Sequence, residues 1–219
     1  MPSLIRIPYC TAEIQARFAR PVIQLIADKA APFQAVVDAL LPFDFDFENT
    51  EANGAALAQH RSTFRIPARN IAFEFGAQSY KFVKDASTWD TAEEDLKVVQ
   101  AGEEALISQG AEIASRSITV GMHVQFLETP RADILSPFAP KPFFGQDIPP
   151  EYKPEQFGFS LKLPKGFVIV DYSRTVANGI FVRITADSAG YVSLQDVAKK
   201  IRQDEQFLAK ILDLQSDLS

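Results

Sequence analysis

The stretch Arg116–Glu128, "RSITVGMHVQFLE", indicates the fold more clearly than any other part of the sequence. Its apolar side chains recur at every second position, namely Ile118, Val120, Met122, Val124 and Phe126. Polar or small residues fill the positions between them, and His123 is one of these. Because successive side chains of a β-strand point to opposite faces, this alternation is typical of a half-buried strand. The sequence therefore predicts a strand over 116–127 with one buried face and one polar face.

The segments on either side of this strand share an order of elements, which is three short strands followed by one long helix. The first group has its strands at about 62–84 and its helix at 88–109. The second group has its strands at about 157–186 and its helix at 193–214. Apolar residues recur every three or four positions in both helices, as in helices with one buried face. Two antiparallel β-meander-plus-helix units of this kind indicate an α+β fold.

An N-terminal strand–helix–strand precedes these two groups. Alternation over 11–18 predicts the first strand. Helical spacing over 21–41 is interrupted by Pro32, which predicts one kinked helix or two short ones. The second strand is expected in "LPFDFDFEN", residues 41–49, because phenylalanines alternate with acids there.

The acids of this last stretch have a second interpretation as a metal or partner site. The three are Asp44, Asp46 and Glu48. A calcium-binding loop is excluded, because its sixth and twelfth positions need glycine and a bidentate acid, and Asn49 and Ala55 occupy them. We therefore favour the solvated face of a strand. Such a face would also be suited to neutralise Arg174 and Arg183 on a neighbouring strand.

The distribution of proline suggests how the chain is divided. Residues 129–154 hold seven of its 14 prolines, and a segment so rich in proline cannot form a regular element. The sequence therefore predicts an N-terminal α+β unit over 1–128, a Pro-rich connector over 129–154 and a C-terminal β-meander plus helix over 155–219. The alternative is one continuous domain.

The composition argues against several classes of protein. The chain has 219 residues, a formal net charge of −6, one cysteine and two histidines. A nucleic-acid-binding surface is not expected, because lysine and arginine are not clustered. The single cysteine excludes an internal disulfide and a multi-cysteine metal site, so we expect no metal or other cofactor.

Targeting and catalytic motifs are not found either. The N-terminus lacks the apolar core of a signal peptide, and no apolar run approaches the ~20 residues of a membrane span, so we expect a cytoplasmic protein without membrane contacts. There is no G-x-S-x-G elbow, phosphate-binding loop or H-E-x-x-H pattern. His123, His60 and Cys10 have no sequence neighbour that marks a base or a nucleophile. No catalytic residue is predicted, and an enzyme is disfavoured.

The hairpin around Asn178-Gly179 supplies the candidate ligand-binding residues. A two-residue turn at this dipeptide would place Arg174 directly opposite Arg183, where two like charges repel each other. With Tyr172 on the same face and Lys162 joining from the neighbouring strand, they would form a small anion-binding face. The alternative, which we favour, is that acids of the chain itself neutralise the two arginines.

A second candidate surface consists of aromatic residues in and beside the connector. They are Phe138, Phe143, Phe144 and Tyr152. These aromatics are too many for a plain linker, which favours a protein–protein surface, with self-association into a homo-oligomer as one outcome. The alternative is that they cover the sheets of their own chain.

Together these observations favour a non-catalytic binding or protein–protein interaction module. The alternative from another class is a small-ligand-binding protein or enzyme. It would have an apolar pocket between sheet and helix, with Arg174, Arg183, Tyr172 or His123 at the polar end. A chaperone-like accessory role, suggested by the acidity and the phenylalanine content, is a third interpretation.

One part of the chain resembles a known family. In residues 79–127 the strand "SYKFV" leads to Trp89 at a helix start and then to a strand containing "TVGMHVQF". This order resembles a sporadically distributed, uncharacterised family of bacterial proteins with a G-[LM]-x-[VY] core, which Gly121, Met122 and Val124 match. That family carries basic residues beside the glycine, where this chain has Thr119 and His123. The resemblance implies no activity and no site.

Overall fold

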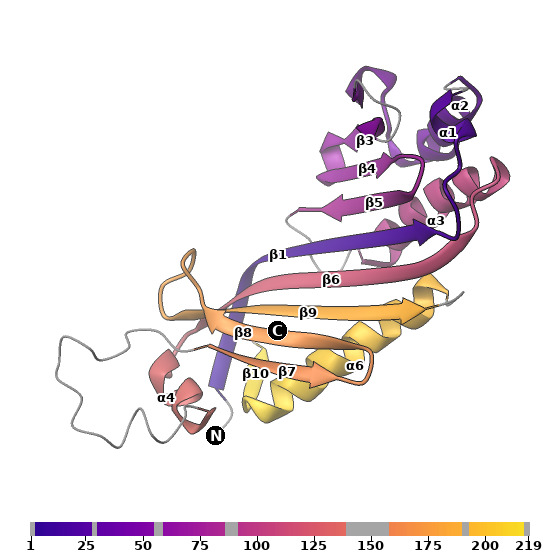
Figure 1. Ribbon diagram of the computed structural model, residues 1–219. Helices are drawn as coiled ribbons and strands as arrows, with labels where there is room; N and C mark the ends of the chain where they lie inside the picture. The colour runs from indigo at the N-terminus through magenta and orange to yellow at the C-terminus, as the bar shows by residue number, and fades with distance from the viewer. Residues whose placement is uncertain are drawn as a thin grey trace. The chain divides into compact units, whose positions relative to one another are not determined.

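A computed structural model describes residues 3–27, 30–54, 59–85, 92–138, 158–189 and 193–216. The strands are β1 (Ser3–Phe18), β2 (Thr50–Asn53), β3 (Arg61–Ile66), β4 (Ile71–Phe75), β5 (Ser79–Lys84), β6 (Ile113–Phe126), β7 (Phe159–Leu163), β8 (Gly166–Tyr172), β9 (Gly179–Ala189) and β10 (Leu214–Ser216). The helices are α1 (Gln24–Ala27), α2 (Ala30–Leu40), α3 (Ala92–Ser108), α4 (Arg131–Leu135) and α6 (Leu194–Ile211), and the short 3-10 helices are η1 (Leu41–Phe43), η2 (Phe47–Asn49), η4 (Pro67–Arg69) and η6 (Ser136–Phe138). The α+β prediction and both meander-plus-helix groups are confirmed (Figure 1).

The strands are hydrogen-bonded in the order β2-β3-β4-β5-β1-β6-β9-β8-β7, and β10 pairs with β1 in parallel. The chain forms two compact units. Unit 1 contains Met1–Cys10, Val120–Thr185 and Lys200–Ser219, and unit 2 contains Thr11–Thr119 and Ala186–Lys199. The sequence-based division at 129–154 remains a prediction, since most of that connector lies outside the described residues.

Unit 2 has an aromatic core on one face of β3, β4 and β5. The strands pair in antiparallel register, and the core face is formed by Phe64, Phe73, Phe75, Tyr80 and Phe82, each at most 2% exposed. Phe33 of α2 contacts the ring of Phe64 at 4.9 Å. Helix α3 approaches the sheet closely at Gly102, where an added Cβ would lie 2.8 Å from the Phe73 ring. The two helices therefore cover this face and leave the other one open.

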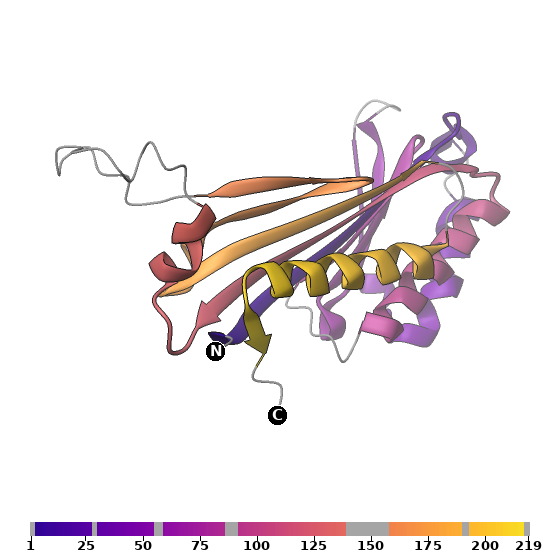
Figure 2. The same cartoon turned by 90° about the horizontal axis from the view of Figure 1, so that it is seen from below.

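Unit 1 repeats this one-sided arrangement with α6. The buried positions of its strands alternate as predicted, and those of β8 and β9 are Val168, Val170, Ile180, Val182 and Ile184. Leu208 and Leu212 are buried at the end of α6, which lies along one face of these strands (Figure 2). Ser193 caps the start of α6, because its Oγ accepts the Asp196 N–H at 3.1 Å. The opposite face of the unit 1 strands has no helix on it within unit 1, in the part of the chain that the structure describes.

The prediction of a strand over 41–49 is wrong. The chain forms η1, turns at Asp44 with a left-handed φ of 64°, and then forms η2. The Asp46 side chain accepts the backbone N–H of Glu48 at 3.1 Å, which stabilises the turn instead of an extended strand. Phe45 is buried, whereas Phe47 is 61% exposed, so the phenylalanines do not share one face. The second strand of the strand–helix–strand follows as β2, and Asp44 forms an ion pair with Arg69, 3.7 Å, and not with Arg174 or Arg183.

The prediction of a two-residue turn at Asn178-Gly179 is also wrong. Strand β8 ends at Tyr172 and β9 begins at Gly179, so the connecting loop has residues 173–178. The loop is wider because the Ser173 hydroxyl accepts two backbone N–H groups within it, and Asn178 has a left-handed φ of 49°. Arg174 therefore lies in the loop and is not opposite Arg183 in a strand pair.

No helix in the described residues is both long and apolar enough to cross a membrane.

Candidate binding surface

The open face of unit 1 carries a line of partly exposed side chains from four strands, and all but one of them have an aromatic ring. We call it the aromatic band and define it as Tyr9, His123, Phe181, Arg183 and Phe167. The His123 ring centroid lies 5.9 Å from that of Tyr9 and 5.1 Å from that of Phe181. Arg183 lies two residues after Phe181 on the same face of β9, and its guanidinium carbon is 5.8 Å from the Phe167 ring centroid. The band thus links β1, β6, β9 and β8.

The alternation of each strand determines which residues form the band. From Arg116 to Phe126 the even positions of β6 are buried, so the side chain of His123 at an odd position reaches the open face. In β9 Ile180, Val182 and Ile184 are buried, which turns Phe181 and Arg183 outward. Tyr9 is 39% exposed and Phe167 is 36% exposed, so the band has a solvent-exposed ring at each end.

His123 is held in one orientation by Ser173. Its Nδ1 lies 2.8 Å from the Ser173 Oγ. That oxygen also accepts the backbone N–H groups of Thr175 at 3.2 Å and Val176 at 2.9 Å. A hydroxyl oxygen has two acceptor sites, both of which are then occupied, so Ser173 must donate its own hydrogen to Nδ1. The imidazole is therefore neutral and carries its proton on Nε2.

The environment of His123 supports the neutral form as well. Partial burial lowers the pKa of its imidazole below the usual 6.5. The pair does not resemble an activated nucleophile, since Ser173 is 6% exposed and its oxygen is engaged by two N–H groups. The arrangement instead presents an Nε2–H donor between two aromatic rings, which is suited to binding.

Several cations of unit 1 have no ion-pair partner among the described residues. They are Lys162, Arg131, Arg174 and Arg183, the last of which belongs to the aromatic band. Arg131 stacks on Tyr172, with its guanidinium carbon 4.2 Å from the ring centroid. Asn178 positions this arginine, because its Oδ1 accepts the Arg131 N–H at 2.9 Å. Asn178 also donates to the carbonyl oxygens of Phe126 and Thr129 at 2.9 and 3.1 Å.

The structure brings together only part of the predicted ligand-binding set. His123 and Arg183 both belong to the aromatic band. Tyr172 follows the alternation of the buried residues of β8 and pairs with Arg131, and Arg174 is exposed in the loop. Sequence reasoning missed Ser173, Phe181 and Phe167; aromatic residues at the outward positions of adjacent strands were the signal for the latter two.

The predicted aromatic interaction surface is described only at Phe138. This residue, at the end of η6, stacks on Phe159 of β7 with ring centroids 4.8 Å apart, so it covers part of its own chain. Phe143, Phe144 and Tyr152 lie outside the described residues, and their role stays a prediction.

The open face of unit 2 is different, because its charges pair with each other. Arg65 lies 3.3 Å from Glu51, Arg61 lies 3.5 Å from Glu74, and Lys81 lies 2.9 Å from Glu13. These pairs connect β2 with β3, β3 with β4, and β5 with β1. Because these charges are paired with each other, this face is stable in contact with water and requires no binding partner.

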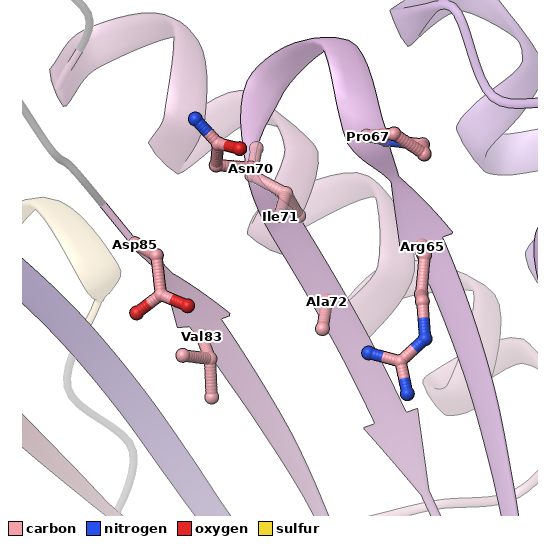
Figure 3. A pocket seen from close by; sticks show the side chains of 7 residues that line it. All are labelled: Arg65, Pro67, Asn70, Ile71, Ala72, Val83 and Asp85. Atoms are coloured by element: carbon pink, nitrogen blue, oxygen red, sulfur yellow. The ribbon is translucent and has the colours of Figure 1, made fainter.

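A shallow pocket of about 200 Å³ lies at one end of this face (Figure 3). It is lined by Arg65, Pro67, Asn70, Ile71, Ala72, Val83 and Asp85. Ligand sites for drug-sized molecules have volumes of roughly 300–1,000 Å³. This pocket is smaller and contains none of the ligand-binding residues predicted from the sequence.

Unit 2 also contains two buried ionic clusters. Glu103 of α3 accepts hydrogen bonds from the Tyr80 hydroxyl and from Arg116, with the Arg116 Nε at 3.0 Å. The side chains of Lys84 and Asp95 are also buried and lie 3.8 Å apart. Burial, together with the Glu103 carboxylate, raises the pKa of Tyr80 well above 10. Because these groups satisfy one another inside the core, we interpret them as structural.

Buried Cys10 and half-buried Glu205 form a further pair of titratable groups in unit 1. Burial, together with the charge of the nearby Glu205, raises the pKa of the Cys10 thiol to about 12. Burial also raises the pKa of Glu205 to about 8, with Asp204 adding to the rise and Arg202 opposing it. A thiol with such a pKa is protonated at neutral pH and is a poor nucleophile. Among the residues that the structure describes, no group of three or more His, Cys, Asp or Glu side chains could hold a metal ion.

A comparison with protein-family models and a search of curated proteins find no match for this chain.

Proposed function

We propose that this protein is a non-catalytic binding module that holds an extended segment of a partner protein on the aromatic band. The observation that carries the proposal is the exposure of Tyr9 and Phe167, on a sheet face that no helix of unit 1 covers in the described residues. Aromatic side chains bury about 150–250 Å² each and dominate the energy of interfaces. Two rings left more than a third exposed, with the half-buried rings of His123 and Phe181 on the two strands between them, therefore favour a partner.

The size and chemistry of the aromatic band favour a small interface. Stable protein–protein interfaces bury about 800 Å² on each partner, which is more than five side chains provide. A short extended segment fits this size better than a folded domain. The neutral His123, with its Nε2–H, supplies a directional donor between the rings, and such a donor suits the carbonyl and carboxylate oxygens of a peptide.

The test is a selection of random 12-residue peptides displayed on phage, followed by affinity measurement by fluorescence polarisation. Peptides selected on the wild type should bind the Phe181→Ser variant about tenfold more weakly or worse, because a central aromatic contact is lost. Phe207→Ser is the matched control, since Phe207 is 53% exposed on α6 and lies outside the aromatic band. That variant should bind like the wild type.

A second variant distinguishes the loss of a binding contact from misfolding of the protein. Phe167→Ser removes a more exposed ring of the same band, and thermal unfolding of each variant reports its folding separately. If selected peptides bind all three variants equally, the aromatic band is not the binding surface. If light scattering shows a dimer that Phe181→Ser dissociates, and no peptide competes, the surface serves self-association instead and the proposal is wrong.

A further inference from the structure

Two cations on the open face of unit 1, Lys162 and Arg183, lie beside the aromatic ring of Phe167. Lys162 lies directly opposite Phe167 in the register of β7 and β8. The Arg183 guanidinium carbon lies 5.8 Å from the centroid of the same ring. Both cationic side chains are exposed. The Phe167 ring therefore has a positive charge beside it on both neighbouring strands.

No carboxylate in the described part of the chain forms an ion pair with either cation. The acid next along the same face of β8 is Asp171, and its Oδ1 accepts the backbone N–H of Tyr172 at 2.7 Å. In unit 2, by contrast, Lys81 and Arg65 each have an acid within 3.3 Å. The corner around Phe167 therefore carries positive charge that the described residues do not neutralise, in a chain whose formal net charge is −6.

The second polar group lies between Tyr9 and Phe181 in the aromatic band. His123 presents Nε2–H, because Ser173 occupies Nδ1, and Nε2 has no hydrogen-bond partner in the described residues. The strands β6, β9, β8 and β7 are neighbours, so His123 and Lys162 lie three strand spacings apart across the sheet, about 14 Å, with a further offset along the strands from Phe181 to Arg183. An extended peptide covers that distance with about four or five residues at ~3.3 Å each.

We infer that the partner segment is acidic: one carboxylate binds Lys162 and Arg183 beside Phe167, an apolar side chain packs on Phe181, and a second oxygen accepts from His123. This inference rests on the proposed function and specifies its partner. The planar guanidinium of Arg183 suits a carboxylate, since it donates two parallel hydrogen bonds. A nucleic acid is not favoured, because two cations on an acidic chain neutralise too few phosphates.

The experiment uses three fluorescein-labelled peptides that differ only in charge, with the sequences ELEFE, SLSFS and KLKFK. Affinity for the full chain is measured by fluorescence polarisation at low and at physiological salt. The acidic peptide should bind about tenfold more tightly than the lysine peptide, and salt should weaken its binding. The double substitution Lys162→Ala/Arg183→Ala should remove this preference and leave the affinity for SLSFS unchanged.

The matched control is Lys199→Ala/Lys210→Ala, which removes the same charge from exposed positions of α6. This control should keep the preference for the acidic peptide. If all three peptides bind equally and all lose affinity in Phe181→Ser, the partner is not acidic but the proposed function stands. If the acidic peptide binds regardless of Phe181, or if oligo(dT) binds more tightly than ELEFE, the inference is wrong.

Discussion

The open faces of units 1 and 2 are built on the same plan but have different chemistry. In both units antiparallel strands are covered by helices on one side. Unit 2 covers its other side with cross-strand ion pairs such as Lys81–Glu13, whereas unit 1 has aromatic rings and cations that do not pair with described residues. A sheet face whose charges pair with each other can remain exposed to water. A face with aromatic rings and cations that form no ion pair with described residues is suited to binding a partner.

The interiors of the units differ in the same way. The buried carboxylate of unit 2, Glu103, is neutralised by Arg116 and bonded by Tyr80. In unit 1 the Oε1 atom of Glu205 is buried without a hydrogen-bond partner among the residues that the structure describes. An unpaired buried carboxyl remains neutral up to a higher pH, which the raised pKa of Glu205 reflects. The comparison therefore predicts different responses to substitution and to pH.

The largest effect is expected from Glu103→Ala in unit 2. This change leaves the Arg116 guanidinium buried without its carboxylate, and breaking such a pair costs about 3–5 kcal/mol of unfolding free energy. Urea denaturation measures it. The control is Glu104→Ala, because the neighbouring Glu104 is exposed and should change stability by less than about 0.5 kcal/mol. The double change Glu103→Leu/Arg116→Met should be closer to the wild type, and equal losses in both variants would contradict an ion-pair origin.

The second effect is expected from Glu205→Gln in unit 1, and it depends on pH. The folded pKa is about 8 against an ordinary value of 4.5, so between these values the folded state binds a proton that the unfolded state has lost. The stability conferred by the neutral acid is therefore present below about pH 4.5 and decreases until about pH 8. At pH 8 the glutamine variant should be more stable by about 2–4 kcal/mol.

Denaturation of this variant at pH 5 and pH 8 is the measurement. At pH 5 the difference from the wild type should be small, because both side chains are then neutral in the folded state. Glu128→Gln, at an exposed position of the same unit, should show no such pH dependence. A pH-independent gain in Glu205→Gln would show that packing and not ionisation causes it.

The smallest effect is expected from Ser173→Ala on the aromatic band. Without the hydroxyl, Nδ1 of His123 loses the donor that favours the neutral ring, so the imidazole pKa should rise toward its usual value. Nitrogen-15 NMR of the two histidines gives the pKa and the tautomer directly, with His60→Gln to assign the signals. Wild-type His123 should carry its proton on Nε2. An unchanged pKa in Ser173→Ala would mean that burial alone sets it.

Local patterns predicted the elements well where one face of a strand or helix is buried. The alternation of β6 identified its buried positions, among them Val120 and Val124, because a sheet with helices on one face exposes the other. The same alternation misled at 41–49, where aspartates bond to nearby N–H groups and form turns. The dipeptide Asn178-Gly179, for which a two-residue turn was predicted, lies at the end of a wider loop that the Ser173 hydroxyl stabilises.

The candidate site depends on contacts between distant residues, which local sequence patterns do not predict. His123 and Ser173 are 50 positions apart in sequence, and Glu103 lies 23 positions from Tyr80, so no spacing rule connects them. The alternation of each strand indicates that Phe181 and Phe167 point outward. Their proximity to His123 and Arg183 depends on the order of the strands in the sheet, which the alternation does not give. Two of the four predicted ligand-binding residues therefore belong to the aromatic band.

The sequence alone determined the α+β class, the two meander-plus-helix groups and the buried face of the central strand, because side-chain periodicity and proline act within a few residues. The tertiary structure decided which strands are neighbours, and so which charges are paired in unit 2 and which aromatics gather in unit 1. Those contacts join residues far apart in the chain, and hydrogen-bonding groups such as Ser173 and Glu103 find their partners only when the sheet is formed.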